Sequence, residues 1–268
     1  SSNDHPVSIL FYQNIISFVF LGIFYFFNFK KLKITSQIFN FFFLISISGV
    51  VIPGTLFYIA ASKVPAGILS LSVAFVPMLT YVSSLYLKIE TFSLLRISGV
   101  FLGFIAIFLL IGPPDSFADR SMVPWVLLAM ICPICYTFEN VFIDIKKPME
   151  VNSITLALGS SAITILILLP IIFYFELFID IKYPFQKIEF SIIALGFITA
   201  VAYTLFIYLI TNAGAVFASN VGYVVTISGV IWGIVLFQET HSYWVWLSLI
   251  TMIVGLSLVS PRRKNKKN

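Results

Sequence analysis

The sequence predicts an all-helical, polytopic membrane protein built from two repeats of inverted topology. Sixty per cent of its 268 residues are hydrophobic and 10% are charged, whereas a soluble domain has about 25% charged residues. Apolar runs of about twenty residues recur along the chain, and each is long enough to cross a hydrocarbon core of about 30 Å as a helix. Helices are expected because lipid cannot satisfy the open backbone groups of a strand. An internal repeat in the sequence indicates that the chain is built from two related parts.

Nine apolar spans are predicted, joined by connections too short to hold a soluble domain. Alternating strands of about ten residues, which are typical of an outer-membrane barrel, do not occur in the sequence. The predicted spans are Val7–Phe29, Ile38–Ala61, Gly67–Leu87, Phe92–Ile111, Met122–Ile143, Ser153–Phe175, Phe190–Ile210, Ala215–Phe237 and Tyr243–Val259.

The internal repeat joins Thr55–Glu90 to Thr204–Glu239 at a constant shift of 149 residues, without a gap. Both copies open with Thr-Leu-Phe and close with Glu-Thr. Apolar sequence gives chance matches easily, but an ungapped register that carries a rare acidic residue at the same place is hard to obtain by chance. The chain is therefore predicted to contain a duplication.

Basic residues predict how the spans are oriented. The first span is followed, not preceded, by Lys30, Lys31 and Lys33, so it is not a cleavable signal peptide. If successive connections alternate between the two sides of the membrane, twelve Lys and Arg residues fall on one side and four on the other. The side with more Lys and Arg is expected to be cytoplasmic. We expect a multi-pass plasma-membrane protein (a bacterial inner-membrane protein) with a cytoplasmic C-terminus. The net charge of +5 then orients the chain in its lipid bilayer and does not indicate nucleic-acid binding.

This topology makes the duplicated segments run in opposite directions, which is common in secondary transporters. Such repeats need an odd number of spans each. We predict a first repeat at residues 1–113, a second at residues 122–261 and a basic cytoplasmic tail at residues 262–268. The second repeat has five spans and the first has four, so we expect the opening helix of the first repeat to be missing from this sequence.

Several small features in a fixed order give the chain a family resemblance. They are the short turn Val64-Pro65-Ala66-Gly67, a helix with Pro77 at mid-span, Glu90 on exit, and Gly99 and Gly103 in the next helix. Together with the duplication, this order resembles the EamA domain of the drug/metabolite transporter superfamily. The resemblance covers essentially the whole chain. It implies a ten-helix exporter or importer of small metabolites, such as amino acids, with a central substrate cavity between two domains.

Met122–Ile143 is the span richest in polar groups, which are costly in lipid and usually face a cavity or the bundle interior. One stripe of this helix carries Cys132, Cys135, Tyr136, Glu139 and Asn140. We predict that Glu139 binds a substrate amine or a coupling proton and that Asn140 is a hydrogen-bonding partner. A Glu that reaches the interface or pairs with a lysine is the alternative. The C-x-x-C spacing here is interpreted as two packing residues.

Further candidates for the substrate pathway come from other spans. Asn220 and Tyr223 are polar where the first copy has Leu71 and Ala74, so they break the repeat symmetry as an asymmetric ligand would require. The remaining candidates are two amides and three tyrosines, for which helix contacts and core packing are the alternatives: Gln13, Asn14, Tyr58, Tyr81 and Tyr203.

Residue types and motifs that the sequence lacks make some substrates and activities less favoured. No Lys or Arg lies deep in a predicted span, which disfavours phosphate-bearing substrates. Neutral, zwitterionic or cationic small molecules, such as amino acids, fit better. No nucleotide-binding loop, metal-ligand spacing or paired carboxylates occur, so we expect no cofactor and no catalytic residues. The predicted function is secondary transport by alternating access. The alternatives are a non-transporting membrane partner or degenerate paralogue and, with less support, an integral-membrane enzyme.

Overall fold

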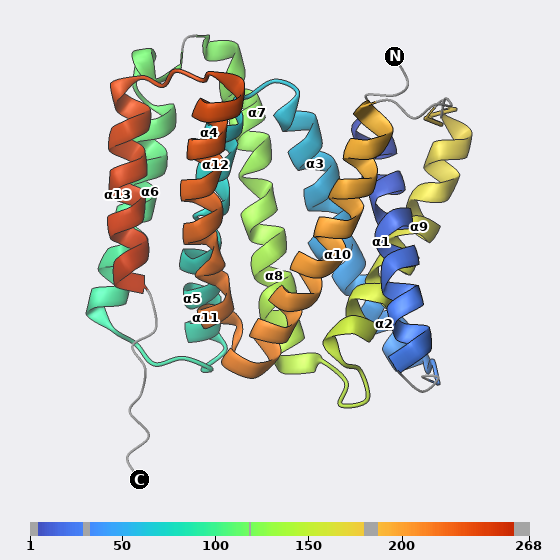
Figure 1. Ribbon diagram of the computed structural model, residues 1–268. Coiled ribbons are helices and arrows are strands. Elements are labelled where there is room, and N and C mark those ends of the chain that lie inside the picture. Colours follow the sequence, from blue (N-terminus) through green and yellow to red (C-terminus); the bar gives the residue numbers. More distant parts are fainter. Residues whose placement is uncertain (1–4, 29–32, 118, 180–186, 260–268) are drawn as a thin grey trace. The chain divides into compact units, whose positions relative to one another are not determined.

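The computed structural model describes residues 5–28, 33–117, 119–179 and 187–259, and all regular structure within these ranges is helical (Figure 1). This confirms the predicted all-helical fold. In chain order the elements are α1 Pro6–Asn28, α2 Ser36–Ser46, the π-helical η2 Ile47–Val51, α3 Ile52–Ala61, α4 Ala66–Val73, α5 Val76–Tyr86, α6 Leu94–Ile111, the short η3 Pro114–Ser116 and η4 Arg120–Met122, α7 Val123–Ala129, α8 Ile131–Lys146, α9 Ser153–Tyr174, α10 Lys187–Ala213, α11 Ala215–Ser219, α12 Val221–Phe237 and α13 Tyr243–Val259.

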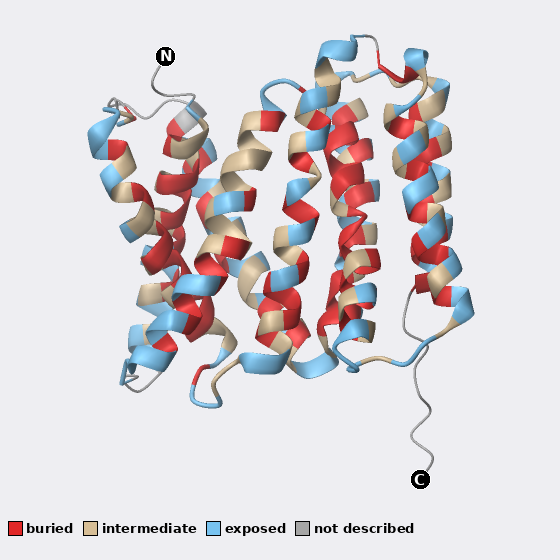
Figure 2. Cartoon of the chain, turned by 180° about the vertical axis from the view of Figure 1, so that it is seen from behind, coloured by how far each residue is buried: buried red, intermediate tan, exposed pale blue. Residues whose placement is uncertain are grey.

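These helices have the length and surface of membrane spans. Eight helical segments of the described chain are long and apolar enough to cross a membrane, and α13 is a further apolar helix of 17 residues. One face of α6 carries three exposed phenylalanine side chains. Their exposed fractions are 67% for Phe101, 53% for Phe104 and 71% for Phe108. Exposed residues continue along the lengths of the helices and are not confined to their ends (Figure 2). Large exposed apolar side chains are expected where a helix faces lipid.

Proline residues account for two of the helix interruptions. Pro77 lies in the first turn of α5, directly after the break at Ala74 and Phe75 that separates α5 from α4. The α7 helix ends at Ala129, four residues before Pro133 in α8, where a proline removes the hydrogen bond to the carbonyl one turn earlier. The α10–α11 connection is a single residue, Gly214, with φ 88°, a conformation that glycine adopts readily. Discontinuous helices are a recurrent feature of transporter folds.

The chain forms two compact units that are not its two sequence repeats. Unit 1 contains residues 1–58 and 142–212, and unit 2 contains residues 59–141 and 213–268. Each unit therefore combines helices from the first and second halves of the sequence. Within both units, spans that correspond to each other in the two repeats pack as pairs. These are α1 with α9 in unit 1, and α6 with α13 in unit 2. In unit 2 the α4–α5 span also packs against the α11–α12 span, through α4 with α12 and α5 with α11.

In unit 2, α6 and α13 cross closely and in opposite directions. A Cβ atom added to Gly99 would lie 2.5 Å from the Gly255 carbonyl oxygen, and Ser248 Oγ donates a hydrogen bond of 2.7 Å to the Ala106 carbonyl. A shift of 149 residues carries Gly99 onto Ser248 and Ala106 onto Gly255, so these two contacts are equivalents. The 149-residue register of the duplication therefore extends to α6 and α13. The small residues at their contact allow the two helix backbones to come close together.

Reciprocal hydrogen bonds join α4 to α12. Ser70 Oγ donates to the Thr226 carbonyl and Thr226 Oγ1 donates to the Ser70 carbonyl, each at 3.1 Å. Nearby, a Cβ atom added to Gly222 would lie 3.5 Å from the Val73 carbonyl oxygen. Because Gly222 and Val73 are equivalents under the 149-residue shift, the α4–α5 and α11–α12 spans cross at equivalent residues, as a local pseudo-two-fold axis requires.

Glu239 caps the N-terminus of α4. Its carboxylate accepts hydrogen bonds from the backbone amides of Ala66 and Gly67, at 2.7 and 3.0 Å. It thus caps a helix of the other repeat. His241 lies beside it, with Nε2 3.4 Å from the carboxylate and its side chain 1% exposed. Negative charge at a helix N-terminus is favourable, so Glu239 ties the two repeats together inside unit 2.

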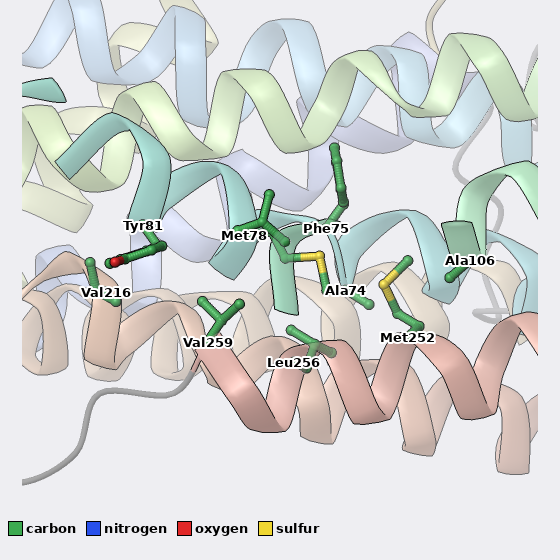
Figure 3. Close-up of a cluster of buried hydrophobic side chains, with 10 residues drawn as sticks. Ala74, Phe75, Met78, Tyr81, Ala106, Val216, Met252, Leu256 and Val259 are labelled. Carbon is green, nitrogen blue, oxygen red and sulfur yellow. The ribbon is translucent and has the colours of Figure 1, made fainter. Parts of the chain in front are cut away.

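The hydrophobic core of unit 2 lies where these helix pairs meet. Figure 3 shows side chains of the α4–α5 break and of α5 lying against α13. The buried members are Ala74, Phe75, Met78, Tyr81, Val100, Ala106, Val216, Met252, Leu256 and Val259. The core of unit 1 is formed by α1 and α9, with Leu10 and Phe11 against Leu168 and Ile172. Each core thus joins equivalent helices of the two repeats.

Candidate functional site

The polar stripe predicted on Met122–Ile143 lies on α8, and its two strongest members are buried in unit 2. Glu139 is 2% exposed and Asn140 is 0% exposed. Tyr136 and Cys135 are half-buried, and Cys132 is buried. A carboxylate and an amide are thus adjacent on one helix, and both side chains are buried.

Asn140 has an unusual hydrogen-bonding state. Neither its Nδ2 nor its Oδ1 has a hydrogen-bond partner among the described residues. A buried polar group left unpaired costs about 1–3 kcal/mol. A side chain with both polar atoms in this state is therefore suited to a partner that comes and goes, such as a small polar molecule.

Two threonines link this part of α8 to the start of α5. The hydroxyls of Thr80 and Thr137 lie 3.5 Å apart, and Thr137 Oγ1 donates to the Val76 carbonyl at 3.5 Å. Both side chains are buried. The polar part of α8 therefore lies beside the turn of α5 that contains Pro77. The sequence did not single out Thr137, because a lone threonine in an apolar span has no distinguishing signal.

The symmetry-breaking pair is found at the α11–α12 interruption of unit 2. Asn220 is the single residue between α11 and α12, and its buried Oδ1 has no hydrogen-bond partner among the described residues. Tyr223 is half-buried and packs against the core of unit 2. Their equivalents Leu71 and Ala74 are 1% and 0% exposed. The two copies therefore carry different side chains at these equivalent positions, and their helix breaks lie at different positions: Ala74 and Phe75 in the first copy and Asn220 in the second.

A second polar group lies in unit 1. The Tyr58 hydroxyl donates to Gln13 Oε1, and Gln13 Nε2 donates to Thr199 Oγ1 at 2.6 Å. The structure thus brings together two predicted residues and adds Thr199 of α10. Asn14 is 3% exposed, and its Nδ2 donates to the Leu10 carbonyl of its own helix at 2.8 Å.

Tyr81 makes a separate set of contacts. The Tyr81 hydroxyl accepts a hydrogen bond from the Ser93 amide at 3.0 Å and donates to the Thr91 carbonyl at 3.2 Å. The Arg96 guanidinium lies 4.4 Å from the centre of its ring. The Tyr81 hydroxyl is therefore engaged by the α5–α6 connection. Tyr203 is half-buried on α10.

Positive charge inside the described spans is neutralised. Arg96 is the one buried Lys or Arg among the described residues, at 9% exposure. Its Nη1 pairs with Glu90 Oε2 at 2.8 Å and its Nε donates to the Val259 carbonyl at 3.0 Å. This ion pair offers no uncompensated cation to a phosphate group.

These features define a multi-pass helical membrane protein with inverted repeats, interrupted helices and a buried carboxylate beside an amide, which is the architecture of a membrane transporter. A sequence model of the EamA-like transporter family matches residues 1–112 and 123–260. The chain therefore belongs to the EamA-like transporter family, within the drug/metabolite transporter superfamily. This is a transporter family, not an enzyme family.

A solved structure supports the fold. One structure, described only as "Crystal structure of protein", matches with a TM-score of 0.71 at 15% sequence identity, over 97% of this chain and 90% of the other. A search of curated proteins gave no match. Within the described residues, no group of three or more His, Cys, Asp or Glu side chains is placed to hold a metal ion.

Proposed function

We propose that the protein is a secondary transporter of small neutral, zwitterionic or cationic metabolites, such as amino acids, in a bacterial inner membrane. It works by alternating access. Family membership supports transport, and the interrupted helices α4–α5 and α11–α12 are of the kind that binds substrates in transporters. The neutralised state of Arg96 favours substrates without phosphate, because buried cations are needed to offset phosphate charge.

The observation that carries this proposal is the pair formed by Glu139 and Asn140. A carboxylate attracts the ammonium group of an amine or amino acid, or carries a coupling proton. The adjacent amide can both donate and accept a hydrogen bond, and its two polar atoms are left without a partner among the described residues. We assign substrate or proton binding to Glu139 and substrate binding to Asn140. Tyr136, Asn220 and Tyr223 belong to the same pathway within unit 2, and Gln13, Asn14, Tyr58 and Tyr203 are candidates within unit 1.

The substitution Asn140→Leu separates a binding role from a structural one. The two side chains have similar volume, and the change removes two buried polar atoms that lack partners. We expect uptake in proteoliposomes to fall about tenfold, because each lost hydrogen bond to the substrate is worth about 0.5–1.5 kcal/mol. We expect the apparent unfolding temperature in detergent to stay the same or rise.

The matched control is Asn212→Leu, which makes the same chemical change at an exposed position of α10. Its uptake should equal that of the unmodified protein. The assignment of Asn140 fails if Asn140→Leu keeps full uptake, or if it lowers the unfolding temperature together with uptake. Unmodified protein that moves nothing across a panel of amino acids and amines would favour a non-transporting role.

A further inference from the structure

A pocket in unit 1, whose lining includes none of the polar groups described above, is formed by two chain connections. Its volume is about 600 Å³, within the usual range of about 300–1,000 Å³ for small-ligand pockets. One wall is the segment that enters α2, and the other is the end of α8 with the α8–α9 connection. The lining residues are Lys33, Thr35, Gln37, Ile38, Ile145, Lys146, Lys147, Pro148, Met149 and Glu150.

The charge of this lining is positive. It contains three lysines, Lys33, Lys146 and Lys147, against one carboxylate, that of Glu150. Within the described residues, Lys33 and Lys146 have no ion-pair partner. Lys147 Nζ donates to the Val151 carbonyl at 2.7 Å, which fixes the side chain in the pocket wall. An ammonium group donates three hydrogen bonds, so Lys147 keeps donors for a ligand.

The start of α2 adds to this positive potential. Thr35 is the N-cap of α2, with Oγ1 accepting from the Ile38 amide, and no acidic residue occupies the first turn. The N-terminus of a helix attracts anions through its free amides and its dipole. The C-terminus of α8 contributes an opposite partial charge of about half a unit, which the full charges of Lys146 and Lys147 outweigh. The chemistry of the pocket is that of an anion site.

Apolar residues at the rim indicate what carries the anion. Met149 is 99% exposed and Ile145 is 47% exposed, and both line the pocket. A soluble anion gains nothing from such neighbours, whereas a phospholipid can place its acyl chains against them. The positive-inside topology puts both connections on the cytoplasmic side, where anionic lipids attract basic segments. We propose that this pocket binds the phosphate headgroup of an anionic phospholipid.

Binding is tested on the purified full chain with short-chain phosphatidylglycerol, using the shift in unfolding temperature as the readout. Short-chain phosphatidylcholine and free glycerol 3-phosphate are the comparison ligands. We expect phosphatidylglycerol to stabilise the protein at concentrations at which the other two do not. Equal effects of phosphatidylcholine would overturn the charge argument, and equal effects of glycerol 3-phosphate would overturn the assignment to a lipid.

The variants test the pocket itself. Lys33→Gln with Lys146→Gln should weaken phosphatidylglycerol binding about 10- to 30-fold, since each lysine near an anionic lipid surface contributes appreciably. Glu150→Gln should tighten it. The matched control, Lys63→Gln with Lys88→Gln, removes the same charge from exposed positions in unit 2 and should bind as the unmodified protein does. A control that weakens binding as much as the pocket variant would show a general charge effect and contradict the proposal.

Discussion

His241 shows how a single residue outside the spans makes stability depend on pH. Burial lowers the pKa of His241 below its usual range, and the nearby Glu239 carboxylate partly opposes that shift. The Trp246 ring lies edge-on to it, with ring centres 6.2 Å apart. The folded protein therefore holds His241 neutral, next to the carboxylate that caps α4.

The folded state's preference for neutral His241 determines whether stability rises or falls with pH. The unfolded chain binds a proton at His241 with a pKa of about 6.5, whereas the folded chain binds it only at lower pH. The stabilising contribution is present above about pH 6.5 and is lost as the pH falls. We expect the apparent unfolding temperature in detergent to drop between about pH 7.5 and 5, and to drop less in His241→Asn. A steeper drop in the variant would contradict this assignment.

At the residue scale, the sequence predicted which side chains are polar in the spans but not which of them meet. The stripe with Glu139 and Asn140 follows from helical spacing alone, and both side chains are buried. The link from Gln13 to Thr199 joins residues 186 positions apart, and no local pattern encodes such a contact. Tyr81 could not be distinguished from a ligand-binding tyrosine, because its hydrogen bonds go to a connection whose path depends on packing.

Among the elements, the close crossing of α6 and α13 gives the sharpest stability prediction. Gly99→Ala would place a Cβ atom 2.5 Å from the Gly255 carbonyl oxygen and 2.9 Å from Leu258 Cβ. The helices must separate to admit it, at a cost of about 1–3 kcal/mol. We expect a clearly lower apparent unfolding temperature.

Gly22→Ala in α1 is the control for this change. Its added Cβ atom would lie 3.9 Å from Leu158 Cδ1, which is an ordinary contact. Alanine also has the higher helix propensity, so this variant should unfold at the same temperature or higher. If both variants have the same effect, the α6–α13 contact is not a determinant of stability.

The predicted spans agree closely with the elements because length and hydropathy determine them. Tyr243–Val259 coincides with α13, and Phe92–Ile111 with α6 apart from two residues at its start. The α4–α5 break follows from Pro77. The break between α11 and α12 was not predicted, because no proline marks it. The 149-residue register is visible in the sequence, but the pairing of equivalent helices in each compact unit depends on long-range contacts.

For the whole molecule, the proposed orientation in the membrane is tested by cysteine labelling. Cys132 and Cys135 are first replaced by serine. Asp115→Cys then lies in a connection assigned to the outside, and Met149→Cys in one assigned to the cytoplasm; both positions are exposed. An impermeant maleimide should label Asp115→Cys in intact cells and Met149→Cys only after permeabilisation. The opposite pattern would reverse the topology.

The duplication, the interrupted helices and the family assignment describe a transporter, and the buried pair on α8 is proposed as its site. Glu139 is the residue on which the proposed function depends most, since a carboxylate that is 2% exposed inside a membrane span usually marks a substrate or proton pathway.

The most direct measurement is substrate uptake into proteoliposomes with and without an imposed pH gradient. Glu139→Gln is compared with the unmodified protein and with Glu176→Gln, which makes the same change at an exposed position. We predict that Glu139→Gln loses the dependence on the gradient and about tenfold or more of the uptake, because a hydrogen bond to a charged group is worth about 1.5–3 kcal/mol. Glu176→Gln should keep both. Unchanged uptake with an unchanged response to the gradient in Glu139→Gln would contradict the account.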